Sequence, residues 1–141
     1  MKRFLDTSVL VAVFYGDHIH HKPSLELFIQ LDRDTGCCGA YSLAELFSTL
    51  TRMPGKYRIG AEQAMLFIGN IRERLAIVAL DGDEYANALG TAAARGIVGG
   101  TIYDALLAHC ALKAQSETIY TWNERHYMQC GAEITKRLRT P

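Results

Sequence analysis

The stretch RFLDTSVLV at residues 3–11 contains the signal that decides the fold. Its start at residues 3–5, with the apolar pair Phe4-Leu5, predicts a short buried strand, and the apolar residues that follow Ser8 predict a helix almost immediately after it. Asp6 stands between the two, at the end of the predicted strand. Short buried strands joined by helices are typical of an α/β domain with a mainly parallel central sheet.

The rest of the chain repeats this alternation of short apolar runs and helical patterns. Further strands are predicted at residues 37–40, 76–80 and 118–121, with a last edge strand at residues 132–135. Helices are predicted at residues 8–15, 21–31, 42–52, 61–74, 83–95 and 101–114, with a helical turn at 124–129. No linker, low-complexity tract or internal repeat divides the sequence, so we expect a single domain over residues 1–141.

Charge and cysteine content exclude several classes of protein. The 15 basic residues balance the 15 acidic ones, which excludes a strongly basic nucleic-acid-binding surface. Any contact with nucleic acid must therefore come from local clusters or from a bound metal. The four cysteines include no C-x-x-C pair, which favours reduced thiols over a disulfide or zinc framework.

The chain offers no segment suited to a membrane or to secretion. Its longest apolar run, residues 9–15, is far too short to cross a bilayer. Asp6 interrupts the first apolar stretch, and no cleavage site of small residues follows it. We therefore expect a cytoplasmic protein.

Polar side chains follow the predicted strands at the points where a parallel sheet places its ligand site. Asp6 ends the first strand, Glu45 lies in the first turn of the helix after the second, and Asn123 follows the strand at residues 118–121. Asp104 opens the helix after a glycine-rich loop. Carboxylates are hard oxygen ligands and suit Mg²⁺ or Mn²⁺. The pattern therefore predicts a divalent metal site at one edge of the sheet.

Helix capping is the alternative explanation for each of these residues. Ser42-x-x-Glu45 has the spacing of a capping box, and Thr101-x-x-Asp104 has the same spacing with a less favoured partner. Asp6 and Asn123 are good N-cap residues as well. Asp104 fits a cap role least, because its helix is apolar nearly all round and a carboxylate there is costly to bury without a partner. A metal shared with other carboxylates would offset that cost.

Three segments together resemble the PIN-domain ribonucleases, in particular the VapC-type toxins of toxin–antitoxin pairs. The segments are residues 4–11 (FLDTSVLV), 42–46 (SLAEL) and 103–108 (YDALLA), and the resemblance covers essentially the whole chain. It implies a three-layer α/β/α domain and an endoribonuclease that depends on Mg²⁺ or Mn²⁺. It also implies an RNA substrate, a cognate antitoxin protein as partner, and a homodimer.

The resemblance also implies a role for each site residue. Asp6, Glu45 and Asp104 would be the acidic metal-binding residues, and the attacking water would leave a 5′-phosphate and a 3′-hydroxyl. The fourth acidic position of the family falls on Asn123 here, which puts a second tightly bound metal in doubt. Thr7, Ser8 and Thr121 would position the substrate or the water by hydrogen bonds.

Two other functions remain open on the sequence alone. The first is a catalytically silent PIN-fold scaffold that binds RNA or protein, supported only by the missing carboxylate at position 123. The second is an aspartyl-phosphate phosphotransferase, because Asp6 follows the first strand. Haloacid-dehalogenase-like enzymes usually carry a second aspartate two residues further on, where this chain has Ser8. The phosphotransferase is therefore the weaker of these two alternatives.

Several other residues allow two interpretations. His18, His20 and His21 are expected in a surface loop rather than at a metal. His126 follows Asn123 near the predicted site, and the sequence leaves open whether it contacts the substrate. Trp122 and Tyr127 could stack on unpaired bases, although packing is favoured for Trp122. The apolar residues of the helices at 21–32 and 61–74 belong either to the core or to a face that binds a second copy or an antitoxin helix.

Overall fold

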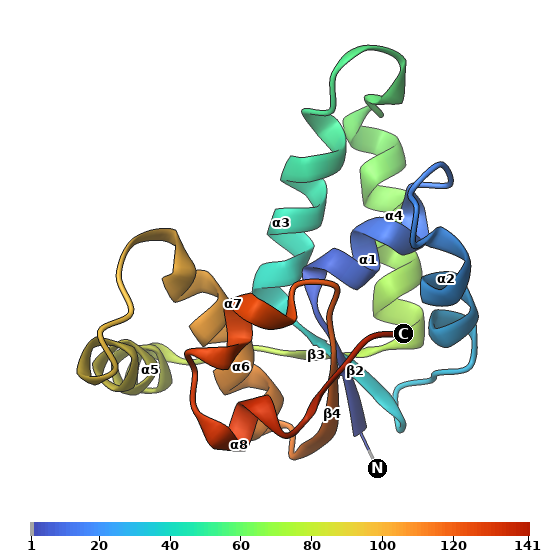
Figure 1. Cartoon of the computed structure of the whole chain (residues 1–141). Helices are drawn as coiled ribbons and strands as arrows, with labels where there is room; N and C mark the ends of the chain where they lie inside the picture. The colour runs from blue at the N-terminus through green and yellow to red at the C-terminus, as the bar shows by residue number, and fades with distance from the viewer. Residues whose placement is uncertain (1) are drawn as a thin grey trace.

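The computed structural model describes residues 2–141, which form one sheet covered by helices on both sides (Figure 1). All neighbouring strands are parallel, in the order β3-β2-β1-β4-β5. Parallel strands have their carboxyl ends at one edge, where the loops to the helices begin. The strands are β1 (Lys2–Leu5), β2 (Gly36–Gly39), β3 (Ala76–Val78), β4 (Ser116–Tyr120) and β5 (Leu138–Arg139).

The helices divide into two groups, with α1 to α4 on one side of the sheet and α5 to α8 on the other (Figure 1). Their bounds are α1 (Thr7–Phe14), α2 (His21–Ile29), α3 (Ala40–Thr51), α4 (Ala61–Arg74), α5 (Gly82–Ala94), α6 (Ile102–Lys113), α7 (Glu124–Met128) and α8 (Ala132–Thr135). Short 3-10 turns lie at Gly55–Tyr57 and Gly99–Thr101. Within residues 2–141, no helix combines the length and apolar character needed to cross a membrane.

The middle strand β1 is buried on both faces, which is why its sequence shows no alternation of apolar and polar residues. Successive side chains of a strand point to opposite faces. Phe4 packs in the core with α6, α7 and α8, and Leu5 packs in the core with α1 to α4, each fully buried. Cys37 and Cys38 of β2 divide between the same two cores, as free thiols. The three-layer α/β/α arrangement is therefore confirmed.

The predicted edge strand at residues 132–135 is wrong, because these residues form the short helix α8. The backbone N–H of Thr135 donates to the carbonyl of Gly131, and that of Lys136 donates to Ala132. The edge strand is β5, which begins at Leu138. In so short a segment only Ile134 has to be buried, and one apolar residue does not distinguish a helical turn from a strand.

The apolar residues of α2 and α4 lie partly in the core and partly on the surface. Phe28 of α2 and Ile68 of α4 are buried in the protein. Ile29 and Met65 remain 56% exposed. Part of each helix therefore completes the core, and part of it faces outward.

Candidate active site

Asp6 is the most tightly held of the predicted site residues. It is the N-cap of α1, directly after β1, and only 4% of it is exposed. Its Oδ2 accepts hydrogen bonds from the Ser8 hydroxyl at 2.7 Å, the Ser8 N–H at 3.3 Å and the Thr121 hydroxyl at 2.8 Å. Its Oδ1 accepts one from the Tyr127 hydroxyl at 2.5 Å. Donors therefore surround both oxygens and hold the carboxylate in one orientation.

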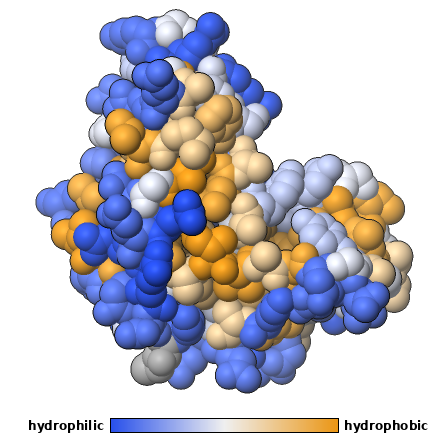
Figure 2. Space-filling model, turned by 180° about the vertical axis from the view of Figure 1, so that it is seen from behind, coloured by the Kyte–Doolittle hydropathy of each residue, from blue (hydrophilic) through white to orange (hydrophobic). Residues whose placement is uncertain are grey.

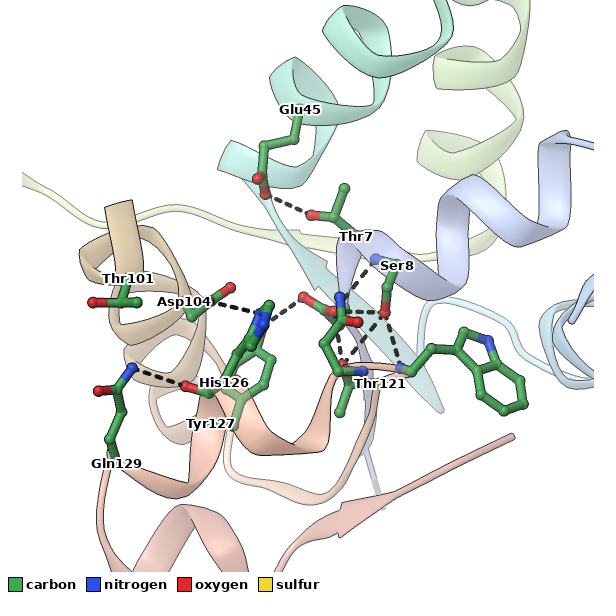
Figure 3. A network of polar contacts seen from close by, with 12 residues as sticks. Thr7, Ser8, Glu45, Thr101, Asp104, Thr121, His126, Tyr127 and Gln129 are labelled. Carbon is green, nitrogen blue, oxygen red and sulfur yellow. Dashed lines mark hydrogen bonds and ion pairs between the residues drawn. The ribbon is translucent and has the colours of Figure 1, made fainter. Parts of the chain in front are cut away.

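The hydroxyls of Ser8 and Thr121 connect Asp6 to the loop after β4 (Figure 3). Each hydroxyl has one hydrogen, and each directs it at Asp6. Their oxygens in turn accept the backbone N–H groups of Trp122 at 3.0 Å and Asn123 at 2.9 Å. Both residues therefore position Asp6 in this structure. Their expected role toward a water or substrate stays a prediction.

Glu45 lies in the second turn of α3 and is not part of a capping box. The N-cap of α3 is Gly39, and no side chain caps this helix. Ser42 lies fully buried inside the helix instead of at its start. The Thr7 hydroxyl lies 2.7 Å from Glu45 Oε1 and 2.8 Å from Ser42 Oγ (Figure 3). The capping-box alternative for Glu45 is therefore wrong, and the side chain instead binds Thr7 of α1.

Asp104 lies in the first turn of α6 and does not form a capping box with Thr101, whose hydroxyl donates to the Val98 carbonyl. Its carboxylate faces His126 of α7, with Oδ2 3.6 Å from the imidazole Nδ1 (Figure 3). Burial raises the pKa of Asp104 to about 6, the negative charge of Asp6 adds to this, and His126 opposes it. His126 is more than half exposed, so this ion pair contributes little.

The pKa of Glu45 is raised as well. Burial is the main cause, the Thr7 hydrogen bond opposes it, and the charges of Asp6 and Asp104 raise the pKa further. The three carboxylates therefore repel one another across a common space. A cation between them would remove this repulsion.

One cavity of about 480 Å³ brings most of the predicted site residues together. Thr121 is fully buried behind Asp6 and does not line it. No lysine or arginine is among the lining residues, so the cavity carries a strong negative charge. Aspartyl-phosphate chemistry needs a lysine beside the aspartate, and this cavity has none. The predicted residues in the lining are Asp6, Thr7, Ser8, Glu45, Asp104 and Asn123.

The cavity fits a hard divalent cation that is held partly through water. The lining supplies carboxylate and amide oxygens, the imidazoles of His18 and His20 and no thiol, and the hard oxygen ligands among these are the ones that Mg²⁺ and Mn²⁺ prefer. Across residues 2–141, no three His, Cys, Asp or Glu side chains lie close enough to chelate one ion jointly. Mg²⁺ usually keeps several of its waters and needs only one or two direct carboxylates.

Asn123 faces the same cavity. It occupies the N-cap position of α7, but its side chain makes no capping hydrogen bond. The capping alternative therefore does not explain the residue, and its amide is free to contact a bound water or phosphate.

The sequence did not reveal the role of Tyr127. Stacking on unpaired bases was one interpretation of Tyr127, and it is wrong because the ring is fully buried among α6, α8 and β5. The hydroxyl donates to Asp6, and burial followed by the charge of Asp6 raises the pKa of Tyr127. No local pattern marks such a tyrosine, because its partner is far away in the sequence.

The loop with His18 and His20 was expected on the surface rather than at a metal. Both side chains line the carboxylate cavity, as does Trp122. No local pattern indicates this, since the loop follows α1 and Trp122 follows β4. Only the parallel sheet brings these two segments to the same edge.

Comparisons with known proteins agree with this geometry. The PIN domain family model matches residues 3–129. Ribonuclease VapC40 of Mycobacterium tuberculosis is 31% identical over 134 residues, which are 95% of this chain and 92% of that protein.

Two solved structures share the fold. One is VapC20 of Mycobacterium tuberculosis, described as a sarcin-ricin loop cleaving toxin, with a TM-score of 0.73, 15% identity and coverage of 94% of this chain and 98% of that one. The other is VapBC2 of Rickettsia felis, bound to a DNA fragment from its promoter, with a TM-score of 0.64, 20% identity and coverage of 99% and 98%. The chain therefore belongs to the PIN-domain family and, within it, to the VapC ribonucleases.

Proposed function

We propose that this protein is a metal-dependent endoribonuclease and the toxin of a type II toxin–antitoxin pair. The observation that carries the proposal is the single cavity that three carboxylates face and that no basic residue neutralises. The name of its relative, Ribonuclease VapC40, supports RNA as the substrate. The description of VapC20 as a toxin supports the second part.

We assign the roles as follows. Asp6 and Asp104 hold Mg²⁺ or Mn²⁺, directly or through water, and Glu45 completes the shell or orients the attacking water. Asn123 contacts the water or the phosphate by hydrogen bonds. The bound ion supplies a charge that stabilises the phosphoryl oxygens and lowers the pKa of a water. The donors around Asp6 keep this carboxylate in place before the ion binds.

Cleavage of RNA by the purified protein tests the proposal. We expect cleavage with Mg²⁺ or Mn²⁺, none in excess EDTA, and recovery when the metal is restored. The products should carry a 5′-phosphate and a 3′-hydroxyl, because a water attacks the phosphorus in line and the 3′-oxygen leaves. Undiminished cleavage in EDTA, or a 2′,3′-cyclic phosphate, would contradict the metal-water mechanism. Absence of cleavage under every metal condition would favour the silent scaffold.

Binding of Mg²⁺ should depend on pH because the ion competes with protons at the cavity. The pKa of Asp104 is raised from its ordinary value of 3.8 to about 6, so between these two pH values the native state holds a proton that the unfolded state has lost. In the metal-free protein, this group therefore makes the native state less stable as the pH rises through about 6. Added Mg²⁺ should raise the Tm clearly at about pH 7.5 and much less at about pH 5. Equal shifts at both pH values in thermal unfolding would contradict Asp104 as a ligand.

Asn123→Asp should strengthen metal binding, because a carboxylate brings a full negative charge toward the ion and an amide brings only a dipole. Repulsion among four acids opposes this when metal is scarce, and at millimolar metal we expect attraction to dominate. Calorimetric titration with Mn²⁺ should show higher affinity or a second bound ion. Asn87→Asp, on an exposed face of α5, adds the same charge away from the cavity and should change neither value. Unchanged binding in Asn123→Asp would place this residue outside the metal shell.

We also propose a cognate antitoxin, a homodimer, a single domain over residues 1–141 and a cytoplasmic location. The VapBC2 structure supports an antitoxin partner. Figure 2 shows apolar side chains gathered in the hollow on the face opposite that seen in Figure 1, and surface of this kind supports a protein partner. Co-expression with the product of a small adjacent gene, followed by co-purification and mass measurement, tests both assemblies.

A further inference from the structure

The rings of His20 and Trp122 form a tight stack at the edge of the carboxylate cavity. Their centroids are 3.7 Å apart and their planes differ by 7°. Both side chains line the same cavity as Asp6, Glu45 and Asp104. An extended flat aromatic surface therefore lies next to the groups proposed to hold the metal.

The stack is built rigidly from the core outward. Trp122 packs against the core of α1 to α4, and its indole N–H donates to the hydroxyl of the fully buried Ser24 at 2.9 Å. Its backbone N–H donates to Ser8, which binds Asp6. Trp122 is the inner ring, since the core lies behind it, and His20 is the outer one. Within residues 2–141, the His20 ring makes no hydrogen bond, and its other aromatic neighbour is the His18 ring, whose centroid lies 5.7 Å away at a tilt of 43°.

The carboxylate cavity continues into further cavities on two sides. On one side it shares Glu45 and Thr49 with a cavity that Arg52 lines. On the other it shares Trp122 and Asn123 with a cavity that Arg125 lines together with Glu124 and His126. The groove is thus negative at its centre, where a metal is proposed, and carries one arginine toward each end. This distribution suits a chain of phosphates crossing the centre, because basic groups contact phosphates that flank the reacting one.

An aromatic face beside such a path suits one kind of group in particular, an unpaired base. Bases within a duplex are stacked on each other and cannot offer a face to a side chain, whereas splayed single-stranded bases stack on aromatic residues. We propose that the outer face of the His20 ring, backed by Trp122, is the platform on which an unpaired base stacks beside the phosphate that is cleaved. This inference rests on the proposed ribonuclease function and assigns to His20 a substrate-positioning role.

Kinetics on a short unpaired RNA test the platform. Loss of base stacking on an aromatic ring weakens binding by about tenfold to a hundredfold, so His20→Ala should raise KM by that factor and change kcat much less. His20→Tyr keeps an aromatic face and should restore most of the affinity. Tyr85→Ala removes an exposed aromatic ring of α5 that lines none of the three cavities, and KM should stay the same.

Binding without cleavage provides a second, independent measurement. Trp122 is the only tryptophan in the chain, so its fluorescence reports directly on this stack. In an Asp104→Asn background with Mg²⁺, unpaired RNA should change the emission, with an affinity that falls in His20→Ala and recovers in His20→Tyr. A duplex of the same sequence should bind much more weakly.

The outcomes separate this inference from the proposed function. If the protein cleaves RNA but His20→Ala leaves KM and the fluorescence titration unchanged, the platform is wrong and the ribonuclease stands. The platform is also wrong if His20→Tyr behaves like His20→Ala, or if duplex and unpaired RNA bind equally. If the protein does not cleave RNA, the titration still decides: a response that depends on His20 supports the platform, and its absence overturns it.

Discussion

Asp104→Asn is expected to lower the kcat of RNA cleavage at least about a hundredfold without lowering the Tm, because a metal clamp on the phosphoryl group contributes several kcal/mol. The amide replaces a charged ligand with a dipole and keeps the shape of the side chain. The carboxylate has few contacts to lose, since its ion pair with the half-exposed His126 spans 3.6 Å. Single-turnover cleavage in Mg²⁺ and thermal unfolding measure the two effects.

A matched control separates metal binding from the general effect of an acid at a helix start. Asp83 lies in the first turn of α5, as Asp104 does in α6, but it is exposed and lines no part of the carboxylate cavity. Both acids interact favourably with the helix dipole, and this interaction is worth about 0.3–1 kcal/mol. Asp83→Asn should therefore change stability slightly and leave cleavage intact. Retained cleavage in Asp104→Asn would show that Asp104, like Asp83, only stabilises the start of its helix.

Asp6→Asn is expected to remove activity to the same degree and to destabilise the protein as well. All four contacts of this buried carboxylate are with hydrogen-bond donors: the Ser8 N–H and the hydroxyls of Ser8, Thr121 and Tyr127. An asparagine offers one acceptor oxygen and turns an NH₂ group toward the remaining donors. Leaving a buried polar group without its partner costs about 1–3 kcal/mol, which lowers the Tm by several degrees in a domain of this size.

Tyr127→Phe separates the structural part of this effect from the chemical part. It removes one donor from Asp6 and retains the carboxylate, so we expect a lower Tm with most of the metal-dependent cleavage preserved. Asp81→Asn is the control for N-capping, because Asp81 caps α5 in an exposed capping box and asparagine caps about equally well. Full activity in Asp6→Asn would show that Asp6 acts only as the N-cap of α1.

The alternation of strands and helices, and with it the parallel sheet covered by helices, could be predicted from the amino-acid sequence alone. Phe4 and Leu5 of β1 are adjacent apolar residues that are buried on opposite faces of the sheet, and this lack of alternation indicated a strand covered on both sides. The helix predicted at residues 61–74 matches α4 without an error at either end, because its periodicity and its ends are local properties. The sequence also placed Asp6, Glu45 and Asp104 after the right elements, and a parallel sheet directs such residues to one edge.

Only the tertiary structure decided which of these residues contact one another. Spacing suggested that Ser42 and Glu45 cap their own helix, whereas both lie next to Thr7 of α1. Tyr127 gave no local sign that it binds Asp6, and His20 gave none that it stacks on Trp122. Local sequence patterns show the periodicity with which side chains face the core and the points at which helices begin and end. They do not record which distant side chain fills the space opposite, because packing of the whole chain around the sheet determines that contact.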